Sequence, residues 1–296
     1  MQIAVDASKV PAVTFERSPG YWQTVGRRFL KDKVAVGAAV VVLLLLLLAV
    51  FGSLLTPSDP YASSMLKRLK PIGFEGHPLG TDELGRDMLS RLMVGARLSL
   101  FMGITPVICA FVLGSLIGIT AGYAGGRVNS VMMRTIDVFY AFPSVLLAIA
   151  LSGALGAGIT NSLISLTIVF IPPIARVAES VTTQIRGRDF VDAARASGAN
   201  AFTIVRVHVL GNVLGPIFVY ATSLIAVSMI LASGLSFLGL GVKPPEPEWG
   251  LMLNTLRTAI YVQPWVAALP GAMIFITSIT FNLLADGLRA AMEIKQ

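Results

Sequence analysis

Long uncharged stretches alternate with short polar segments along most of the chain. The stretches long enough to form membrane spans cover residues 34–55, 98–126, 138–175, 213–237 and 266–288. A helix that crosses the hydrocarbon core of a bilayer needs about 20 apolar residues. The stretch 138–175 is too long for one such helix and long enough for two. The pattern therefore predicts an all-α polytopic membrane protein with six transmembrane helices; two short spans in place of the one at 213–237 are the alternative.

Glycines mark two places within these stretches. Small and polar residues interrupt the run that holds the third and fourth spans, and so predict the tip of a hairpin there: Gly153, Gly156, Gly158 and Asn161. In the second span every fourth residue over one stretch is a glycine: Gly114, Gly118 and Gly122. This spacing places the three on one helix face and lets another helix approach closely.

The polar segment 56–97, which precedes the second span, contains several prolines and charges of both signs. Three acids cluster in it: Asp82, Glu83 and Asp87. Their spacing fits no calcium-binding loop. We therefore expect them to serve as turn and cap residues.

Two further polar connections follow. Residues 129–137 form a short basic connection, and residues 243–263 form a second long loop stiffened by prolines. Tryptophan is enriched where a helix meets the membrane surface. We therefore expect Trp249 and Trp265 to anchor at an interface.

The polar segment 186–211, which we call the elbow, has structure of its own. Asp189 is positioned to cap a helix that also carries Asp192 near its positive end. Gly198 ends this helix, and Asn200 is positioned to cap a second short one. The pattern predicts two helices that meet at a glycine, a shape that another protein can approach closely. An amphipathic loop resting on lipid headgroups is the alternative.

Composition and charge agree with a membrane protein. Hydrophobic residues make up 55% of the 296 residues and charged residues 13%, which is too apolar for a soluble domain of this length. The net charge of +7 is spread over several short loops, so the membrane accounts for it better than nucleic acid does. The single cysteine, Cys109, excludes an internal disulfide and a cysteine-based metal site.

The distribution of cations predicts the orientation. With six spans and both termini on one side, most of the 23 lysines and arginines lie on the side that holds the elbow. Positive charge accumulates on the cytoplasmic side of membrane proteins. We therefore predict a cytoplasmic elbow, a polar and irregular cytoplasmic segment 1–33, and a cytoplasmic tail 291–296.

The chain carries little chemistry of its own. It lacks the phosphate-binding motif G-x-x-x-x-G-K-[ST], and no ionisable residue lies near the centre of a predicted span. We predict no catalytic, metal or cofactor site. One alternative is a secondary carrier, since sodium held by backbone carbonyls leaves no sequence trace. The other is an intramembrane protease that pairs His208 with Ser197 or Ser236.

Several motifs resemble one family. Asp192-Ala193-Ala194 followed by Gly198 and then His208-x-Leu210 resembles the E-A-A-x-x-x-G cytoplasmic loop of ATP-binding-cassette (ABC) importer permeases. The chain is most similar to the C-type permease subunit of oligopeptide and dipeptide importers. Further matches cover most of the chain from about residue 25: GTDELGRD (80–87), GYAGG (122–126), MRTIDVFYAFPS (133–144), LSFLGLGVKPPEPEWG (235–250) and FNLLADGLR (281–289). Two positions depart from the family pattern, since Asp192 replaces Glu and Gly211 replaces Pro.

The resemblance implies a type I ABC importer permease (MetI-like) fold in a bacterial inner membrane. It implies a first transmembrane helix and outer loop over 34–96, and a transmembrane core over 97–290 that contains the coupling loop 186–211. The implied partners are a second homologous permease subunit, two ATP-binding subunits and an extracytoplasmic solute-binding protein. Di- or oligopeptides are the expected solutes; glutathione, a nickel chelate, an opine or a sugar are the alternatives.

The resemblance also assigns roles within residues 189–210, which would couple the chain to the ATP-hydrolysing subunits. It implies four residues that hold the shape of the elbow: Asp192, Ala193, Ala194 and Gly198. It implies three candidate contacts to the partner: Arg195, Phe202 and Arg206. The two arginines are alternatively lipid headgroup anchors. The resemblance assigns no residues to the substrate path.

Overall fold

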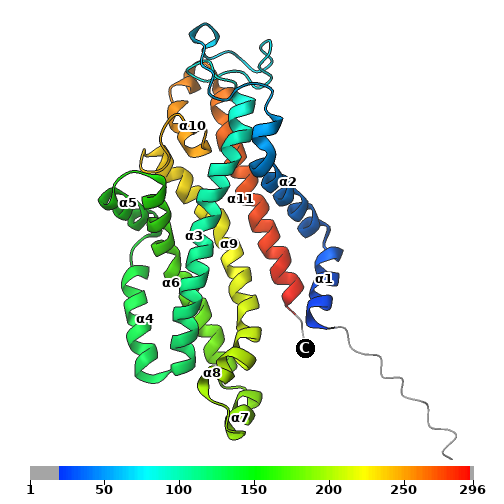
Figure 1. The fold of residues 1–296 in the computed structure, drawn as a ribbon, viewed down its shortest axis with the longest axis vertical. Helices are drawn as coiled ribbons and strands as arrows, with labels where there is room; N and C mark the ends of the chain where they lie inside the picture. The colour runs from blue at the N-terminus through cyan, green and yellow to red at the C-terminus, as the bar shows by residue number, and fades with distance from the viewer. Residues whose placement is uncertain (1–19, 294–296) are drawn as a thin grey trace, which may run out of the picture.

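A computed structural model describes residues 20–293, and α-helices make up most of this part of the chain (Figure 1). Three of the cations that support the predicted orientation lie outside the described residues: Lys9, Arg17 and Lys295. The α-helices, in chain order, are α1 (Tyr21–Lys31), α2 (Lys33–Leu55), α3 (Met88–Ala124), α4 (Gly126–Tyr140), α5 (Ser144–Leu155), α6 (Ile159–Arg186), α7 (Asp189–Ala196), α8 (Ala201–Ile204), α9 (Leu210–Phe237), α10 (Trp249–Thr255) and α11 (Pro264–Met292).

Within residues 20–293, five helical runs are long and apolar enough to cross a membrane: α2, α3, α6, the run Ala201–Phe237 that contains α9, and α11. A sixth candidate is the pair α4 and α5, which meet at 85°. The predicted multispan all-α class is confirmed. The predicted third span is wrong in detail, because α5 has only 12 residues and the basic connection 129–137 is part of helix α4. Pro143 occupies the N-cap position of α5. Because a proline disfavours the helical conformation of the residue before it, the helix breaks at this point and the chain turns.

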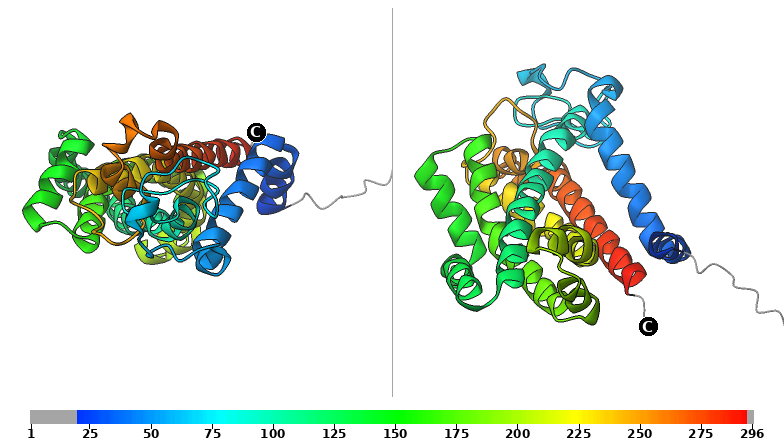
Figure 2. Two further views of the ribbon diagram at one scale, coloured as in Figure 1. Left: turned by 90° about the horizontal axis from the view of Figure 1, so that it is seen from above. Right: turned by 60° about the horizontal axis from the view of Figure 1, so that its bottom comes forward.

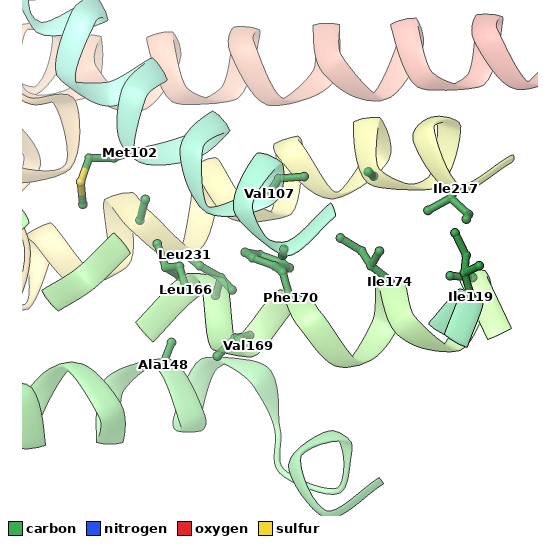
Figure 3. Packing of buried hydrophobic residues seen from close by; sticks show 14 of the residues in the cluster. Met102, Val107, Ile119, Ala148, Leu166, Val169, Phe170, Ile174, Ile217 and Leu231 are labelled. Atoms are coloured by element: carbon green, nitrogen blue, oxygen red, sulfur yellow. The ribbon is translucent and has the colours of Figure 1, made fainter. Parts of the chain in front are cut away.

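Helices α3, α5, α6 and α9 surround one apolar cluster. Figure 3 shows members of this cluster from all four helices, among them Val107 of α3, Ala148 of α5, Phe170 of α6 and Leu231 of α9. The predicted glycine face of α3 packs directly on α6. A Cβ atom at Gly118 would overlap the Ala175 carbonyl oxygen and lie 2.6 Å from Cβ of Ala178. The close helix contact predicted from the glycine spacing is therefore confirmed.

The loop before α3 holds a buried ion-pair network. Asp82 accepts from Nε of Arg86 at 2.6 Å and lies 3.3 Å from Nε of Arg91. Asp87 caps α3 by accepting from the Ser90 backbone N–H at 2.8 Å. Asp82 also accepts from the Leu84 N–H at 2.9 Å, so the predicted turn and cap roles of Asp82 and Asp87 are confirmed, while Glu83 lies 3.4 Å from Nη2 of Arg86. The cap also explains why α3 starts at Met88, ten residues before the predicted span.

Helix α10 returns a short apolar segment into the bundle. Trp249, which we expected at a membrane interface, is fully buried, and its indole N–H donates to the Leu92 carbonyl at 3.0 Å. That prediction is wrong because α10 packs between α9, α11 and α3. Trp265, at the start of α11, is 78% exposed.

The prediction of an irregular segment over 1–33 is wrong for residues 21–31, which form helix α1. Helix α1 packs on α11 and α2 near the C-terminal end of α11 (Figure 1). The rest of the predicted N-terminal segment, 1–19, lies outside the described residues, as do residues 294–296 of the predicted tail.

Candidate functional site: the helical elbow

The elbow lies at one end of the bundle, opposite the loop that connects α2 and α3 (Figures 1 and 2). It joins two long helices directly. Two residues separate the end of α6 from the start of α7, and a π-helical turn, Val205–Val209, links α8 to α9. A force applied to the elbow therefore acts directly on α6 and α9.

Helix α7 starts one residue earlier than the predicted cap implies. Arg188 occupies the cap position with no side-chain hydrogen bond, and Asp189 is the first helical residue. The predicted Asp189 cap is therefore wrong. Both Asp189 and Asp192 nevertheless lie in the first turn, where a carboxylate stabilises the helix dipole. Asp192 also accepts from Arg195 at 2.9 Å.

Helix α7 ends at Ala196, and Gly198 terminates it as predicted. Gly198 has a φ of +83°, its N–H donates to the Arg195 carbonyl at 2.9 Å, and the Ala199 N–H donates to the Ala194 carbonyl at 3.1 Å. These two bonds are the pattern of a Schellman cap, which needs a left-handed residue at the position of Gly198. Ala194 and Ala199 both pack against the core cluster, so the cap fixes α7 against the bundle.

The second elbow helix starts at the predicted cap. Oδ1 of Asn200 accepts from the Thr203 N–H at 2.8 Å, so the Asn200 cap is confirmed. The π-helical turn that follows was not predicted, because its residues continue the apolar periodicity of a regular helix. Gly211, which stands where the family pattern has a proline, lies inside α9 with open space beside it. Nothing in the structure explains this replacement.

The elbow has a buried apolar side and an exposed side. Val191, Ile204 and Val209 are buried against the bundle. Six of the seven predicted coupling residues are exposed and the seventh, Ala194, is half-buried. Phe202 is the most exposed large apolar side chain of the elbow, at 74%.

Three residues that sequence reasoning missed belong to the same surface. Phe190 and Val207 are exposed apolar residues of the elbow, and the Phe190 ring lies 6.4 Å from the His208 ring. Tyr123, at the end of α3, lies 5.9 Å beneath the guanidinium of Arg195. The exposed apolar residues of the elbow could have been identified from the sequence, whereas the contact between Arg195 and Tyr123 depends on where α3 ends relative to the elbow.

The geometry does not support the protease alternative. His208 and Ser236 lie at opposite ends of the run Ala201–Phe237, about 40 Å apart at 1.5 Å per residue. The hydroxyl of Ser197 donates to the Ala193 carbonyl at 2.9 Å. His208 is therefore not positioned to activate either serine. What the elbow offers instead is an exposed, well-defined helical surface.

Comparisons with known proteins identify similar chains. Residues 114–295 match the model of the binding-protein-dependent transport system inner membrane component, and residues 20–71 match the N-terminal transmembrane domain of oligopeptide transport permease C. The chain is 41% identical to the glutathione transport system permease protein GsiD of Pectobacterium atrosepticum, covering 93% of this chain and 91% of that protein. It is 39% identical, over the same shares, to the di/tripeptide transport system permease protein DppC of Pseudomonas aeruginosa.

A solved structure shares the fold. The inward-facing methionine ABC transporter MetNI aligns with a TM-score of 0.57 at 20% identity, covering 69% of this chain and 97% of the matched chain.

Proposed function

The chain belongs to the family of binding-protein-dependent transport system inner membrane components, as an ABC importer permease of the oligopeptide and dipeptide type, and from this premise we propose that it imports short peptides. It is a multi-pass permease subunit of the bacterial inner membrane, and ATP hydrolysis belongs to partner subunits of such importers. Two similar permeases are named for glutathione and for di- and tripeptides. All of these solutes are short peptides, which supports the proposed class over opines, nickel chelates and sugars.

We also propose that the chain is coupled to ATP-hydrolysing subunits through the elbow, and the observation that supports this is that the elbow is exposed and joins α6 to α9. In our proposal a groove on an ATP-hydrolysing subunit receives α7 and α8, as in recognition of a helix in a groove. Phe202 is the anchor, because exposed aromatic side chains contribute most to such contacts. Arg195 and Arg206 supply charged contacts around it.

The remaining coupling residues act by holding shape. Asp192 orients Arg195 through their ion pair, and Gly198 supplies the left-handed turn between the helices. The small side chain of Ala193 lets the partner subunit approach the exposed side of α7, and that of Ala194 lets the bundle pack closely on the inner side. When ATP closes the partner subunits, the movement passes through the elbow to α6 and α9 and changes which side of the path is open.

We further propose the full assembly that the family resemblance implies. This chain pairs with a second homologous permease, so that each forms half of the path. Two ATP-binding subunits bind the elbows from the cytoplasm, and an extracytoplasmic solute-binding protein delivers the peptide.

Gly198→Val tests the elbow. Nothing lies within 4 Å of a Cβ atom at Gly198, so the disturbance comes from the backbone, since a β-branched residue is strained at a φ of +83°. We expect the importer to assemble, while the substrate-stimulated ATPase activity and uptake in proteoliposomes fall at least about tenfold. A tenfold fall corresponds to an increase of about 1.4 kcal/mol in the free-energy barrier of the coupled step.

Two variants control for side-chain size and for conformation. Gly187→Val adds the same side chain in open space at a φ of −89° and should leave transport unchanged. Gly198→Asn should retain more coupling than Gly198→Val, because asparagine tolerates the left-handed region. Normal stimulation and uptake in Gly198→Val would remove the elbow from the mechanism.

The peptide assignment has its own test. The reconstituted importer with its binding protein should take up radiolabelled di- and tripeptides or glutathione in an ATP-dependent manner. Uptake of a sugar or a nickel chelate with no uptake of any peptide would contradict the substrate class and leave the elbow proposal standing.

A further inference from the structure

Helix α1 has one face fixed against the bundle. Val25 is buried, and the Phe29 ring reaches within 3.6 Å of the Cβ position at Gly287 of α11. Nη1 of Arg28 donates to the Glu293 carbonyl at 3.1 Å. These contacts hold α1 beside the C-terminal end of α11, so the helix presents a defined outer face.

That outer face combines an apolar stripe with a cationic stripe. Trp22 and Leu30 are 70% and 72% exposed and, with Gly26 between them, follow one side of the helix at intervals of four residues. Arg27 and Lys31 follow the adjacent side, also four residues apart. An amphipathic helix with aromatic and aliphatic residues beside arginine and lysine is typical of membrane surfaces.

The positive charge of this region has little compensation within the described residues. Arg27, Arg28, Lys31 and Lys33 are all exposed and lie within seven residues. Among residues 20–293, no carboxylate forms a salt bridge with any of the four. Asp32, the acid between them, accepts from the Val34 and Ala35 N–H groups to cap α2.

We propose that α1 and the start of α2 form a binding site for anionic phospholipid headgroups. The site lies directly before the apolar helix α2, where the chain enters the membrane, so a lipid headgroup is the nearest source of negative charge. The four cations would bind phosphate groups, and Trp22 and Leu30 would contact the adjoining acyl region. Bound lipid would also relieve the repulsion among four like charges and so stabilise α1 against α11.

Quenching of Trp22 fluorescence by brominated lipids tests the proposal. The full-length chain carrying Trp265→Phe retains Trp22 and Trp249, and Trp249 is fully buried and therefore shielded from lipid. This chain is reconstituted into phosphatidylcholine bilayers that contain equal mole fractions of brominated phosphatidylglycerol or brominated phosphatidylcholine. A further Trp22→Phe substitution gives the background signal.

We expect Trp22 to bind brominated phosphatidylglycerol at least about fivefold more strongly than brominated phosphatidylcholine, as judged by the extent of quenching. A factor of this size corresponds to the attraction of one cation to an anionic membrane surface. High salt should reduce the preference, because salt screens exposed charges. Arg27→Gln with Lys31→Gln should lower it severalfold, and glutamine preserves the helix. The control pair Arg68→Gln with Arg257→Gln removes two exposed cations elsewhere and should leave it unchanged.

Equal quenching by the two brominated lipids would overturn the proposal, because it would show lipid contact without a preference for anionic headgroups. A preference for phosphatidylglycerol that survives Arg27→Gln with Lys31→Gln would also overturn it. Because the measurement reports lipid contact, its outcome is independent of peptide transport.

Discussion

Glu248 is a carboxylate inside the contact between α10 and α3, and it is only 1% exposed. It caps α10 by accepting from the Gly250 and Leu251 N–H groups at 2.8 Å, and the Ser99 hydroxyl donates to it at 3.3 Å. Burial raises the pKa of Glu248 above the ordinary carboxyl value, and the hydrogen bonds offset this only in part. The folded state therefore favours the protonated form.

The raised pKa predicts a pH-dependent effect of Glu248→Gln. As pH rises from the ordinary carboxyl pKa through the raised one, the unfolded state loses its proton first, so the wild-type protein loses stability. Glutamine does not titrate and resembles the protonated acid. We expect the melting temperature of Glu248→Gln, relative to wild type, to increase between pH 5 and pH 8.5 in detergent.

The control for this measurement is Glu75→Gln, which removes the same charge from an exposed position. Its melting curve should parallel that of wild type at every pH. If Glu248→Gln also runs parallel to wild type across the range, the carboxylate is charged in the folded state throughout.

The sequence predicted the backbone roles of single residues better than it predicted which residues pack around them. Gly198 and Asn200 were predicted as a helix end and a helix start, because the backbone conformation at each depends mainly on local residues. The space beside Gly198 is open, so glycine is needed there for its left-handed backbone conformation and not for close packing. Trp249 was misplaced because its burial depends on Leu92, which is 157 residues away in the chain.

Among the helices, α3 and α6 form the contact that organises the bundle. We predict that Gly118→Leu lowers the free energy of unfolding by about 1–3 kcal/mol, because the new side chain would overlap the α6 backbone. Thermal unfolding of the purified chain in detergent measures this. Gly153→Leu is the matched control, since Gly153 lies in α5 with nothing within 4 Å of its Cβ position. Equal stability of the two variants would contradict the close contact.

Helix α7 permits a test that separates the helix dipole from a specific contact. Asp192→Lys places a second cation beside Arg195 and should displace it from Tyr123. We expect it to lower recovery of the ATP-binding subunits severalfold in co-purification. The stability of the chain itself should change by less than about 1 kcal/mol, because the ion pair is exposed.

Asp189→Lys controls for this effect, because it opposes the same dipole from the first position of α7 without contacting Arg195. It should retain more of the partner subunits than Asp192→Lys. Equal loss in both variants would mean that the dipole alone matters and that Asp192 has no role in the shape of the elbow.

The helices that the sequence predicted poorly are those whose limits are set by packing. Apolar length alone predicted α2 and α11 to within a few residues. The α4–α5 pair was divided wrongly, because α4 is held to α6 by polar contacts, including Asn129 to Glu179 at 2.7 Å, that no periodicity reveals. Helix α1 was missed because its apolar positions are few and one of its faces is polar.

At the scale of the whole molecule, burial changes how the charges are counted. The polar segment 56–97, which we predict on the outer side, carries six of the 23 lysines and arginines. Arg86 and Arg91 are buried and both pair with the buried Asp82, so they are not free to interact with headgroups. Removing such pairs strengthens the bias of exposed cations toward the end that carries the elbow and α1.

The orientation itself is a prediction that labelling of introduced cysteines tests. In a Cys109→Ser background, Ala62→Cys lies in the loop between α2 and α3, and Ser197→Cys lies in the elbow; both positions are exposed. A membrane-impermeant maleimide applied to intact spheroplasts should label Ala62→Cys, and should label Ser197→Cys only after permeabilisation.

The four outcomes of this labelling have three meanings, because the two positions lie at opposite ends of one bundle (Figure 1). The reverse pattern would keep the architecture and invert the orientation, and an elbow on the outer side could not bind a cytoplasmic ATP-hydrolysing subunit. Labelling of both positions before permeabilisation, or of neither, would contradict the arrangement of the spans. Only labelling of Ala62→Cys alone leaves the elbow where hydrolysis of ATP can move α6 and α9.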